Sequence, residues 1–236
     1  MVEVRNLSFS YSRRRILKDV SFSVANGETV AVVGVNGAGK TTLLKILSTL
    51  AFPDSGSVVL DGQDAFSRPL RYRRQLGYLP EKTALYDDLT VRDYLFYRAN
   101  LKGEPPKRVR RRVSEASELC RLSSLMRRGI RFLSAGEKKK LALADALLLR
   151  PRVLLLDDFF AGLDVPMRES AQTILSEAAA FSSVIVTGHE IDDLVKVSAR
   201  VLVLSHGGIS DEIPVAALGR DAAEAGVRRA LAGGGR

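Results

Sequence analysis

The apolar positions in the first third of the chain repeat every two residues, which is the period of β-strands. Apolar and polar residues alternate over 2–9 and 20–24, so two strands with one buried face each are predicted. Residues 28–35 are mostly apolar and β-branched, as in a strand buried on both faces. After a glycine-rich turn, leucines at helical spacing predict a helix over 40–50, and a further strand is predicted over 57–60. The chain therefore begins as a strand-rich unit.

Helical spacing replaces this alternation in the middle of the chain, from about residue 86 to residue 149. The apolar positions predict a helix from Val91 to near Gly103, a second over 107–125 and a third over 137–149. Prolines follow the first and the third of these segments, where they would end a helix. The middle of the chain is therefore expected to be a helical lobe.

Strands and helices alternate in the last third. Short apolar runs predict strands over 153–156, 184–187 and 201–204, and longer periodic segments predict helices over 167–180 and 191–197. Alternation of this kind indicates a parallel sheet that is covered by helices.

Composition places the chain among soluble globular proteins, because 46% of its 236 residues are hydrophobic and 27% are charged. Its single cysteine, Cys120, excludes a disulfide framework and indicates a reducing compartment; we expect it to be a small buried residue. No stretch approaches the ~18 apolar residues of a membrane span, and the first residues lack the apolar core of a signal peptide. A cytoplasmic protein is therefore expected.

The net charge of +9 is concentrated in three stretches, over 68–74, 107–112 and 127–140. A basic surface suits nucleic acid, an anionic membrane face or phosphate ligands. Runs of like charge are most often solvated helix faces, however, so the charge alone does not select a function.

A phosphate-binding motif follows the buried strand over 28–35. The residues from Gly34 to Thr41 read Gly-Val-Asn-Gly-Ala-Gly-Lys-Thr and fit G-x-x-x-x-G-K-[ST] between a predicted strand and a predicted helix. Glycines let backbone N–H groups turn around an anion, and the helix N-terminus adds its partial positive charge. Lys40 is expected to reach the β- and γ-phosphates of a nucleotide, and the Thr41 hydroxyl to ligate Mg²⁺.

A carboxylate ends the strand predicted over 153–156. Ligands of nucleotide-binding parallel sheets lie at the carboxyl ends of the strands, so Asp157 is expected to hold Mg²⁺, directly or through water. The acidic position is weak evidence alone and strong evidence when it is paired with the phosphate loop.

In their order along the chain, these motifs resemble the nucleotide-binding subunits of ATP-binding-cassette (ABC) transporters over residues 1–212. The resemblance implies an α/β fold with a P-loop NTPase core, made of a mixed sheet with an antiparallel β subdomain, and an inserted helical lobe. The implied ranges are about 1–85 and 150–212 for the core, about 86–149 for the lobe, and 213–236 for a C-terminal extension with a frayed tail from residue 222 onward.

The resemblance also implies roles for single residues. Tyr11 resembles the aromatic residue that stacks on adenine. Residues 133–137, Leu-Ser-Ala-Gly-Glu, resemble the family signature, through which Ser134 and Gly136 would contact the ATP held by a second subunit. Asp164 resembles the aspartate that couples the two ATP sites, and His189 the switch histidine that contacts the γ-phosphate. The implied nucleotide ligands in the phosphate loop are Gly34, Asn36, Gly37, Ala38, Gly39, Lys40, Thr41 and Thr42.

The sequence departs from the family pattern at three positions. Glu81 stands where glutamine is common; it could offer an oxygen to Mg²⁺ or its water, and the same change is frequent in exporters of drugs, haem and polysaccharides, so it favours that branch. Ala135 replaces the first signature glycine, and we expect binding to survive. Asp158 stands where a glutamate polarises the attacking water.

The aspartate at position 158 is one methylene shorter than glutamate, so its oxygens retreat by roughly 1.5 Å. A misplacement of about 1 Å can cost on the order of 10²-fold in rate. Our hypothesis is that the protein binds MgATP normally and hydrolyses it slowly; alternatively, the local backbone compensates. The next two residues, Phe159 and Phe160, suit either a dimer partner or the local core.

The resemblance implies an ATPase that works as a pair of ABC subunits, identical or not, on a transmembrane permease, at the inner face of the cell membrane. ATP and Mg²⁺ are the implied ligands. Two alternatives stay open: a nucleotide-dependent scaffold with weak hydrolysis, and a soluble ABC ATPase that acts on nucleic acid. The second is disfavoured because the chain has neither long insertions nor a second cassette, so no specific nucleic acid is expected.

Overall fold

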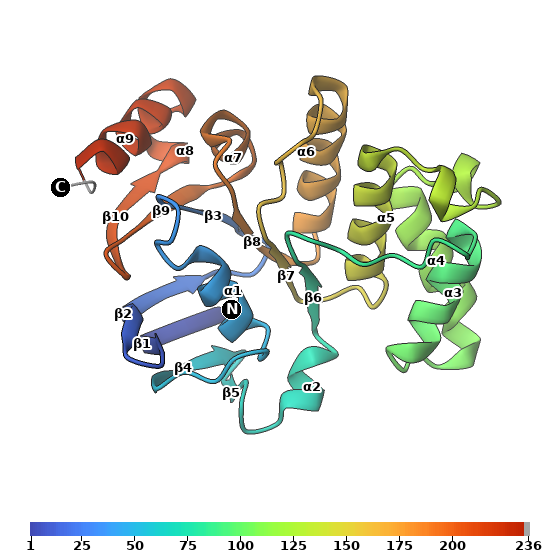
Figure 1. Ribbon diagram of the computed structural model, residues 1–236, viewed down its shortest axis with the longest axis horizontal. Helices are drawn as coiled ribbons and strands as arrows, with labels where there is room; N and C mark the ends of the chain where they lie inside the picture. Colours follow the sequence, from blue (N-terminus) through green and yellow to red (C-terminus); the bar gives the residue numbers. More distant parts are fainter. Residues whose placement is uncertain (234–236) are drawn as a thin grey trace.

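The computed structural model describes residues 1–233, which form two sheets and a group of helices (Figure 1). The smaller sheet is antiparallel and has the strand order β2-β1-β4-β5; the larger has the order β10-β9-β3-β8-β7-β6. The strands are β1 (Val2–Tyr11), β2 (Arg14–Val24), β3 (Thr29–Val33), β4 (Ser55–Leu60), β5 (Gln63–Asp64), β6 (Leu76–Leu79), β7 (Val153–Leu156), β8 (Ser183–Thr187), β9 (Arg200–Ser205) and β10 (Gly208–Pro214).

Helices flank the larger sheet and form a separate lobe at one side of it (Figure 1). They are α1 (Lys40–Leu47), α2 (Pro69–Arg73), α3 (Val91–Leu101), α4 (Pro106–Leu119), α5 (Ala135–Leu147), α6 (Val165–Ala179), α7 (Ile191–Val197), α8 (Val215–Leu218) and α9 (Arg220–Gly233), with short 3-10 turns at Ser123–Leu125 and Ile130–Phe132. The expected fold, a mixed sheet with an antiparallel subdomain and a helical lobe, is confirmed.

The central strand β3 is buried on both faces of the larger sheet. It pairs in parallel with β8 on one side and with β9 on the other, and all five of its residues are buried. Ala31 and Val33 belong to the core under the helical lobe, whereas Val30 and Val32 belong to the core shared with α1 and the smaller sheet. Successive residues of a strand face opposite sides, so β3 contributes to both cores. The antiparallel β10 closes one edge of the sheet.

A charged cluster joins the helices of the lobe. The guanidinium of Arg98 on α3 donates to both carboxylate oxygens of Asp145 on α5, at 3.0 and 2.9 Å, and Lys102 Nζ lies 2.9 Å from Asp145 Oδ1. The Asp145 side chain is only 11% exposed. A carboxylate this buried requires paired cations, so the three residues fix α3 against α5.

Several expected elements were wrong in extent; for example, the strand expected over 20–24 begins at Arg14. The helix expected over 107–125 ends at Leu119, because Arg121 takes a left-handed conformation with φ of 55° and the chain continues as a 3-10 turn. The frayed tail expected from residue 222 is wrong as far as residue 233, since α9 buries Ala223 and Val227 beside α7, β9 and β10. Residues 234–236 of that expected tail lie outside the described residues.

Two questions that the sequence left open are settled by burial. Phe159 and Phe160 are 2% and 0% exposed and pack on each other edge to face, so they fill the local core and do not present a surface to a partner. Cys120 is fully buried, as expected, and burial raises the pKa of its thiol.

Candidate functional site

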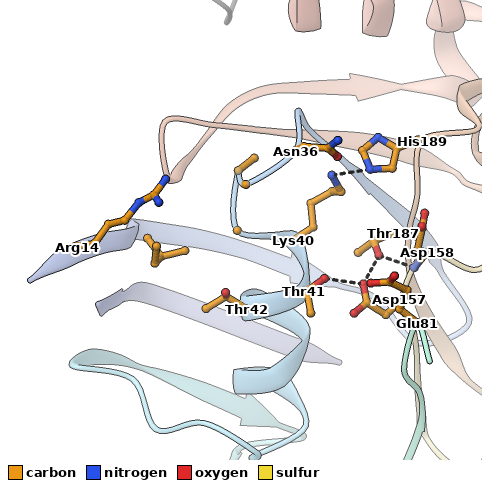
Figure 2. Close-up of a pocket in the computed structure, with 14 residues that line it drawn as sticks. Arg14, Asn36, Lys40, Thr41, Thr42, Glu81, Asp157, Asp158, Thr187 and His189 are labelled. Atoms are coloured by element: carbon orange, nitrogen blue, oxygen red, sulfur yellow. Dashed lines mark hydrogen bonds between the residues drawn. The ribbon is translucent and has the colours of Figure 1, made fainter. Parts of the chain in front are cut away.

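A cavity of about 370 Å³ lies at the carboxyl ends of β3, β7 and β8, in front of the N-terminus of α1 (Figure 2). Its walls come from the phosphate loop, from both acidic residues that follow β7, and from the segment after β8. It is lined by Arg14, Ile16, Asn36, Gly37, Ala38, Gly39, Lys40, Thr41, Thr42, Glu81, Asp157, Asp158, Thr187 and His189. Residues more than 140 positions apart in the sequence therefore meet at one edge of the sheet.

The phosphate loop needs its glycines for two different reasons. Gly37 and Gly39 have φ of 80° and 110°, in the left-handed region that glycine adopts without strain. Gly34 is required for space, because a Cβ atom there would lie 2.4 Å from the Leu204 carbonyl oxygen. Gly39 is also the N-cap of α1, so the free N–H groups of the first helical turn face the cavity. The loop therefore has the geometry of an anion site.

The ammonium of Lys40 is held inside the loop. Its Nζ donates to the carbonyl oxygen of Gly34 at 2.7 Å and lies 3.3 Å from Nε2 of His189, as Figure 2 shows for the histidine. Burial lowers the pKa of Lys40, and the nearby carboxylates of Asp158 and Asp157 oppose that shift. The Lys40 cation thus lies in the loop with the carboxylates of Asp157 and Asp158 behind it.

Asp157 is buried at the back of the cavity and is only partly satisfied. Its Oδ1 accepts from the hydroxyls of Thr41 at 3.2 Å and Thr187 at 2.8 Å (Figure 2). Its Oδ2 is buried and has no hydrogen-bond partner within residues 1–233. A buried carboxylate oxygen without a partner is costly, and a hard cation or its water is a suitable partner.

This arrangement fits Mg²⁺. Thr41 and Asp157 supply oxygen ligands side by side, and Glu81 lines the same cavity. Over residues 1–233, no group of three or more His, Cys, Asp or Glu side chains could hold a metal by itself. That is expected of Mg²⁺, which takes one or two protein oxygens and completes its shell with phosphates and water.

Asp158 is held by its backbone rather than by its side chain. Its φ is 47°, and its N–H donates to the Thr187 hydroxyl at 3.0 Å. The buried Oδ1 has no hydrogen-bond partner among the described residues. Burial and the neighbouring carboxylate of Glu190 raise the pKa of Asp158, while His189 and Lys139 oppose the rise.

Five of the expected site residues are not among those that line this cavity in the described chain: Tyr11, Gly34, Ser134, Gly136 and Asp164. Tyr11 is at the end of β1, 48% exposed, with its ring edge to face on Phe9 at 4.8 Å. Ser134 forms a capping box with Glu137 at the start of α5, next to Gly136. Asp164 caps α6 by accepting from the N–H of Met167.

Sequence reasoning missed three residues that the fold brings to the site. Arg14 and Ile16 line the cavity from β2, where Arg14 pairs with Tyr11 across the hairpin (Figure 2 shows Arg14). Thr187, the last residue of β8, joins Asp157 to Asp158. The signal for Thr187 was its place two residues before His189; the signal for Arg14 was its closeness to Tyr11 in the hairpin.

Comparison with known proteins points to one family. The family described as "ABC transporter" matches residues 17–161. A sulfate/thiosulfate import ATP-binding protein of Synechococcus elongatus is 35% identical over 211 residues, which are 88% of this chain and 61% of that protein. A molybdate/tungstate import ATP-binding protein of Pyrococcus abyssi is 35% identical over 210 residues, 88% of this chain and 60% of that one.

A solved structure, described as the ATP-binding subunit of an ABC transporter, superimposes with a TM-score of 0.82 at 29% identity. The superposition covers 97% of this chain and 94% of that one. The chain spans about three fifths of the length of the two curated relatives described above.

Proposed function

Because the chain belongs to the ABC transporter family, we propose that it binds ATP with Mg²⁺ in the cavity before α1 and hydrolyses it to drive a transporter. In this proposal the ATPase domain is 1–212 and the helical lobe is about 86–149. The observation that carries it is the contact of the phosphate loop with Asp157: Oδ1 accepts from the Thr41 hydroxyl, and the buried Oδ2 has no hydrogen-bond partner among the described residues.

In this proposal, different residues of the cavity bind the phosphates, hold Mg²⁺ and assist hydrolysis. The glycine-rich loop and the first N–H groups of α1 bind the phosphates, and Lys40 leaves the Gly34 carbonyl to contact the β- and γ-phosphates. Thr41 and Asp157, with Glu81 nearby, would hold Mg²⁺, which when bound neutralises charge on the phosphates. Asp158 accepts the proton of the attacking water, and His189 contacts the γ-phosphate.

The remaining expected ligands suggest that the site is completed by a second subunit. Ser134, Gly136 and Asp164 lie at the N-termini of α5 and α6, outside the cavity of their own chain. A helix N-terminus favours an anion, so Ser134 and Gly136 would suit the γ-phosphate of an ATP held by a partner ABC subunit. Tyr11 would reach adenine from the hairpin beside Arg14. ATP then favours the closed pair because it contacts both halves.

A separate groove supports the proposal of a membrane partner. It measures about 840 Å³ and runs between α2, α3 and α5. Leucines line it, and Leu70 and Leu101 are largely exposed, beside the cations of Arg71 and Arg74. An exposed apolar groove between the core and the helical lobe suits a helix of a permease subunit.

Within residues 1–233, no helix has the length and apolar character needed to span a bilayer. We propose, from its family membership, that the chain works in the cytoplasm, peripheral to the inner face of the membrane and bound to such a permease. The two relatives described above are named as import proteins, whereas Glu81 favours an export branch, so the direction of transport stays a prediction.

The test is an equilibrium titration of the purified protein with MgATP, followed by a phosphate-release assay. Wild type should bind and hydrolyse ATP, and Lys40→Ala should lose at least ~10-fold in affinity, because a charge-assisted contact to phosphate contributes about 1.5–3 kcal/mol. Lys45→Ala, a basic residue in the last turn of the same helix, is the matched control. Unchanged ATP affinity in Lys40→Ala would show that the loop is not the nucleotide site.

A further inference from the structure

Lys139, on the second turn of α5, makes contacts that have no role in the ATPase reaction as proposed above. Its Nζ donates to the carbonyl oxygen of Asp158 at 3.2 Å and to that of Ala161 at 3.0 Å. The same ammonium lies 5.7 Å from the centre of the Phe159 ring, over its face. One side chain from the helical lobe therefore contacts three residues of the turn 158–161, which begins with the second residue of the acidic pair.

The turn that Lys139 contacts has an unusual backbone conformation at its first residue. Asp158 has a φ of 47°, a conformation that an L-residue adopts only when its surroundings hold it there. Thr187 holds it from one side: its hydroxyl accepts from the Asp158 N–H at 3.0 Å, and its carbonyl oxygen accepts from the Phe159 N–H at 3.2 Å. Lys139 holds the opposite side, at the Asp158 carbonyl. Both polar groups of the Asp158 backbone are thus fixed.

The fixed backbone matters because the side chain is not fixed. The buried Oδ1 of Asp158 has no hydrogen-bond partner in the part of the chain that the structure describes. Because no hydrogen bond holds this short carboxylate, the position of the Asp158 side chain depends on the conformation of the backbone that carries it. The contacts of Lys139 and Thr187 therefore decide where the proton acceptor of the proposed reaction lies.

Partial burial of the Lys139 ammonium is unfavourable by itself, which argues that its charge has a role at this position. The side chain is half-buried, and burial lowers the pKa of Lys139, against the opposing effect of the carboxylates of Asp158, Glu190 and Glu81. A methionine would fill the same space without burying a charge. Two carbonyl acceptors and an aromatic face are what an ammonium can use and an apolar side chain cannot.

We propose that Lys139 is a positioning residue for hydrolysis: it clamps the turn 158–161 to the helix that begins with the signature residues, and so places the Asp158 carboxylate. The proposal rests on the proposed ATPase function. Lys139 is not expected to touch ATP, because it lies outside the residues that line the nucleotide cavity in the described chain.

The test compares Lys139→Met with Lys139→Arg and with the control Lys138→Met. Lys138 is the neighbouring residue on α5 and pairs with the exposed Asp87 at 3.1 Å, away from the clamped turn. Single-turnover hydrolysis and equilibrium ATP binding are measured for each protein. Since a displacement of about 1 Å can cost on the order of 10²-fold in rate, we expect Lys139→Met to hydrolyse ATP at least ~10-fold more slowly.

The affinity of Lys139→Met for ATP should stay within about twofold of wild type, because the phosphate contacts are unchanged. Lys139→Arg keeps a cation that can donate to both carbonyls, so it should recover most of the lost rate. Lys138→Met should match wild type. A rate of Lys139→Met within twofold of wild type overturns the proposal, and so does a parallel loss of folding or ATP affinity, which would make Lys139 a general stability residue.

Amide hydrogen exchange of the nucleotide-free protein separates this proposal from the proposed function. The amides over 159–163 should exchange about tenfold faster in Lys139→Met than in wild type or Lys138→Met, because local opening of the turn becomes easier. Unchanged exchange there means that Lys139 does not clamp the turn. If wild type failed to hydrolyse ATP while exchange still responded, the ATPase assignment would be wrong and the clamp would stand.

Discussion

The ammonium of Lys40 lies 3.3 Å from Nε2 of His189, although the two residues are 149 positions apart. The phosphate loop after β3 and the loop after β8 carry them to the same point, in front of the first turn of α1. The contact fixes the distance between the two groups that we propose to act on the γ-phosphate. A phosphate oxygen that enters the loop would replace the Gly34 carbonyl as the partner of Lys40.

We predict that His189→Ala affects hydrolysis much more than binding. Removal of one preorganised donor to a developing negative charge typically costs about 10²–10³-fold in rate. ATP affinity should change by less than about threefold, since the loop amides and Lys40 remain. Phosphate release and a nucleotide titration measure the two effects separately. Equal losses in both would mean that His189 serves binding instead.

We predict that Asp158→Glu raises the rate of a single turnover by up to ~10²-fold, because the carboxylate regains the roughly 1.5 Å that aspartate lacks. The same change should lower the free energy of unfolding by about 1 kcal/mol, since glutamate tolerates the φ of 47° less well than aspartate. Asp158→Asn is the matched loss of charge and should hydrolyse ATP very slowly. If Asp158→Glu shows no gain in rate, the backbone already compensates for the shorter side chain.

The sequence was sufficient for those elements whose signal is local. The bounds of β7 and α7 were predicted as the structure has them, because a short apolar run and a short periodic segment each lie between clear breaks. The phosphate loop was predicted for the same reason: its glycines, Lys40 and Thr41 are consecutive. The strand β6 was missed because residues 76–79 become a strand through pairing with the distant β7. The strand β10 was missed because it is a mostly exposed edge strand, in a hairpin with β9, and lacks a run of apolar residues.

Site residues could be predicted from the sequence where a residue directly follows a strand. They could not be predicted where the site depends on contacts between side chains and backbone groups of different elements. Asp157 and His189 follow strands, so their place at the sheet edge was clear. Lys139 gave no such signal, because it lies within a run of three lysines and is set apart only by its contacts with the turn after β7. The left-handed backbone of Asp158 was invisible as well, since aspartate adopts many conformations.

We predict that Asp145→Ala lowers the free energy of unfolding by about 3 kcal/mol, because it leaves the cations of Arg98 and Lys102 without their shared carboxylate. Chemical denaturation followed by circular dichroism measures the change. Asp87→Ala is the control: its ion pair with Lys138 is 60% exposed on the Asp87 side, and such pairs contribute less than about 1 kcal/mol. Similar effects of both substitutions would rule out a special role for the buried cluster.

We predict that the Cys120 thiol is inert in the folded protein. Burial raises its pKa, so the thiolate that reacts with alkylating agents is scarce even at mildly alkaline pH. Iodoacetamide at pH 8.5 should modify the native protein at least ~100-fold more slowly than the protein unfolded in guanidinium, where the thiol regains its ordinary pKa of about 8.5. Comparable rates in the two states would contradict the burial of this side chain.

The helix α5 has consequences beyond its contacts at any one position. Its first residues carry the capping box of Ser134, its middle holds Lys139, and its last turn carries Asp145. Thirteen residues of α-helix measure about 20 Å and resist bending. A push on the Ser134 end therefore cannot be absorbed within the helix. The whole helix would move with that end, and the displacement would reach the turn at Asp158, which contacts Lys139, and the groove beside α3, which lies at the last turn of the helix.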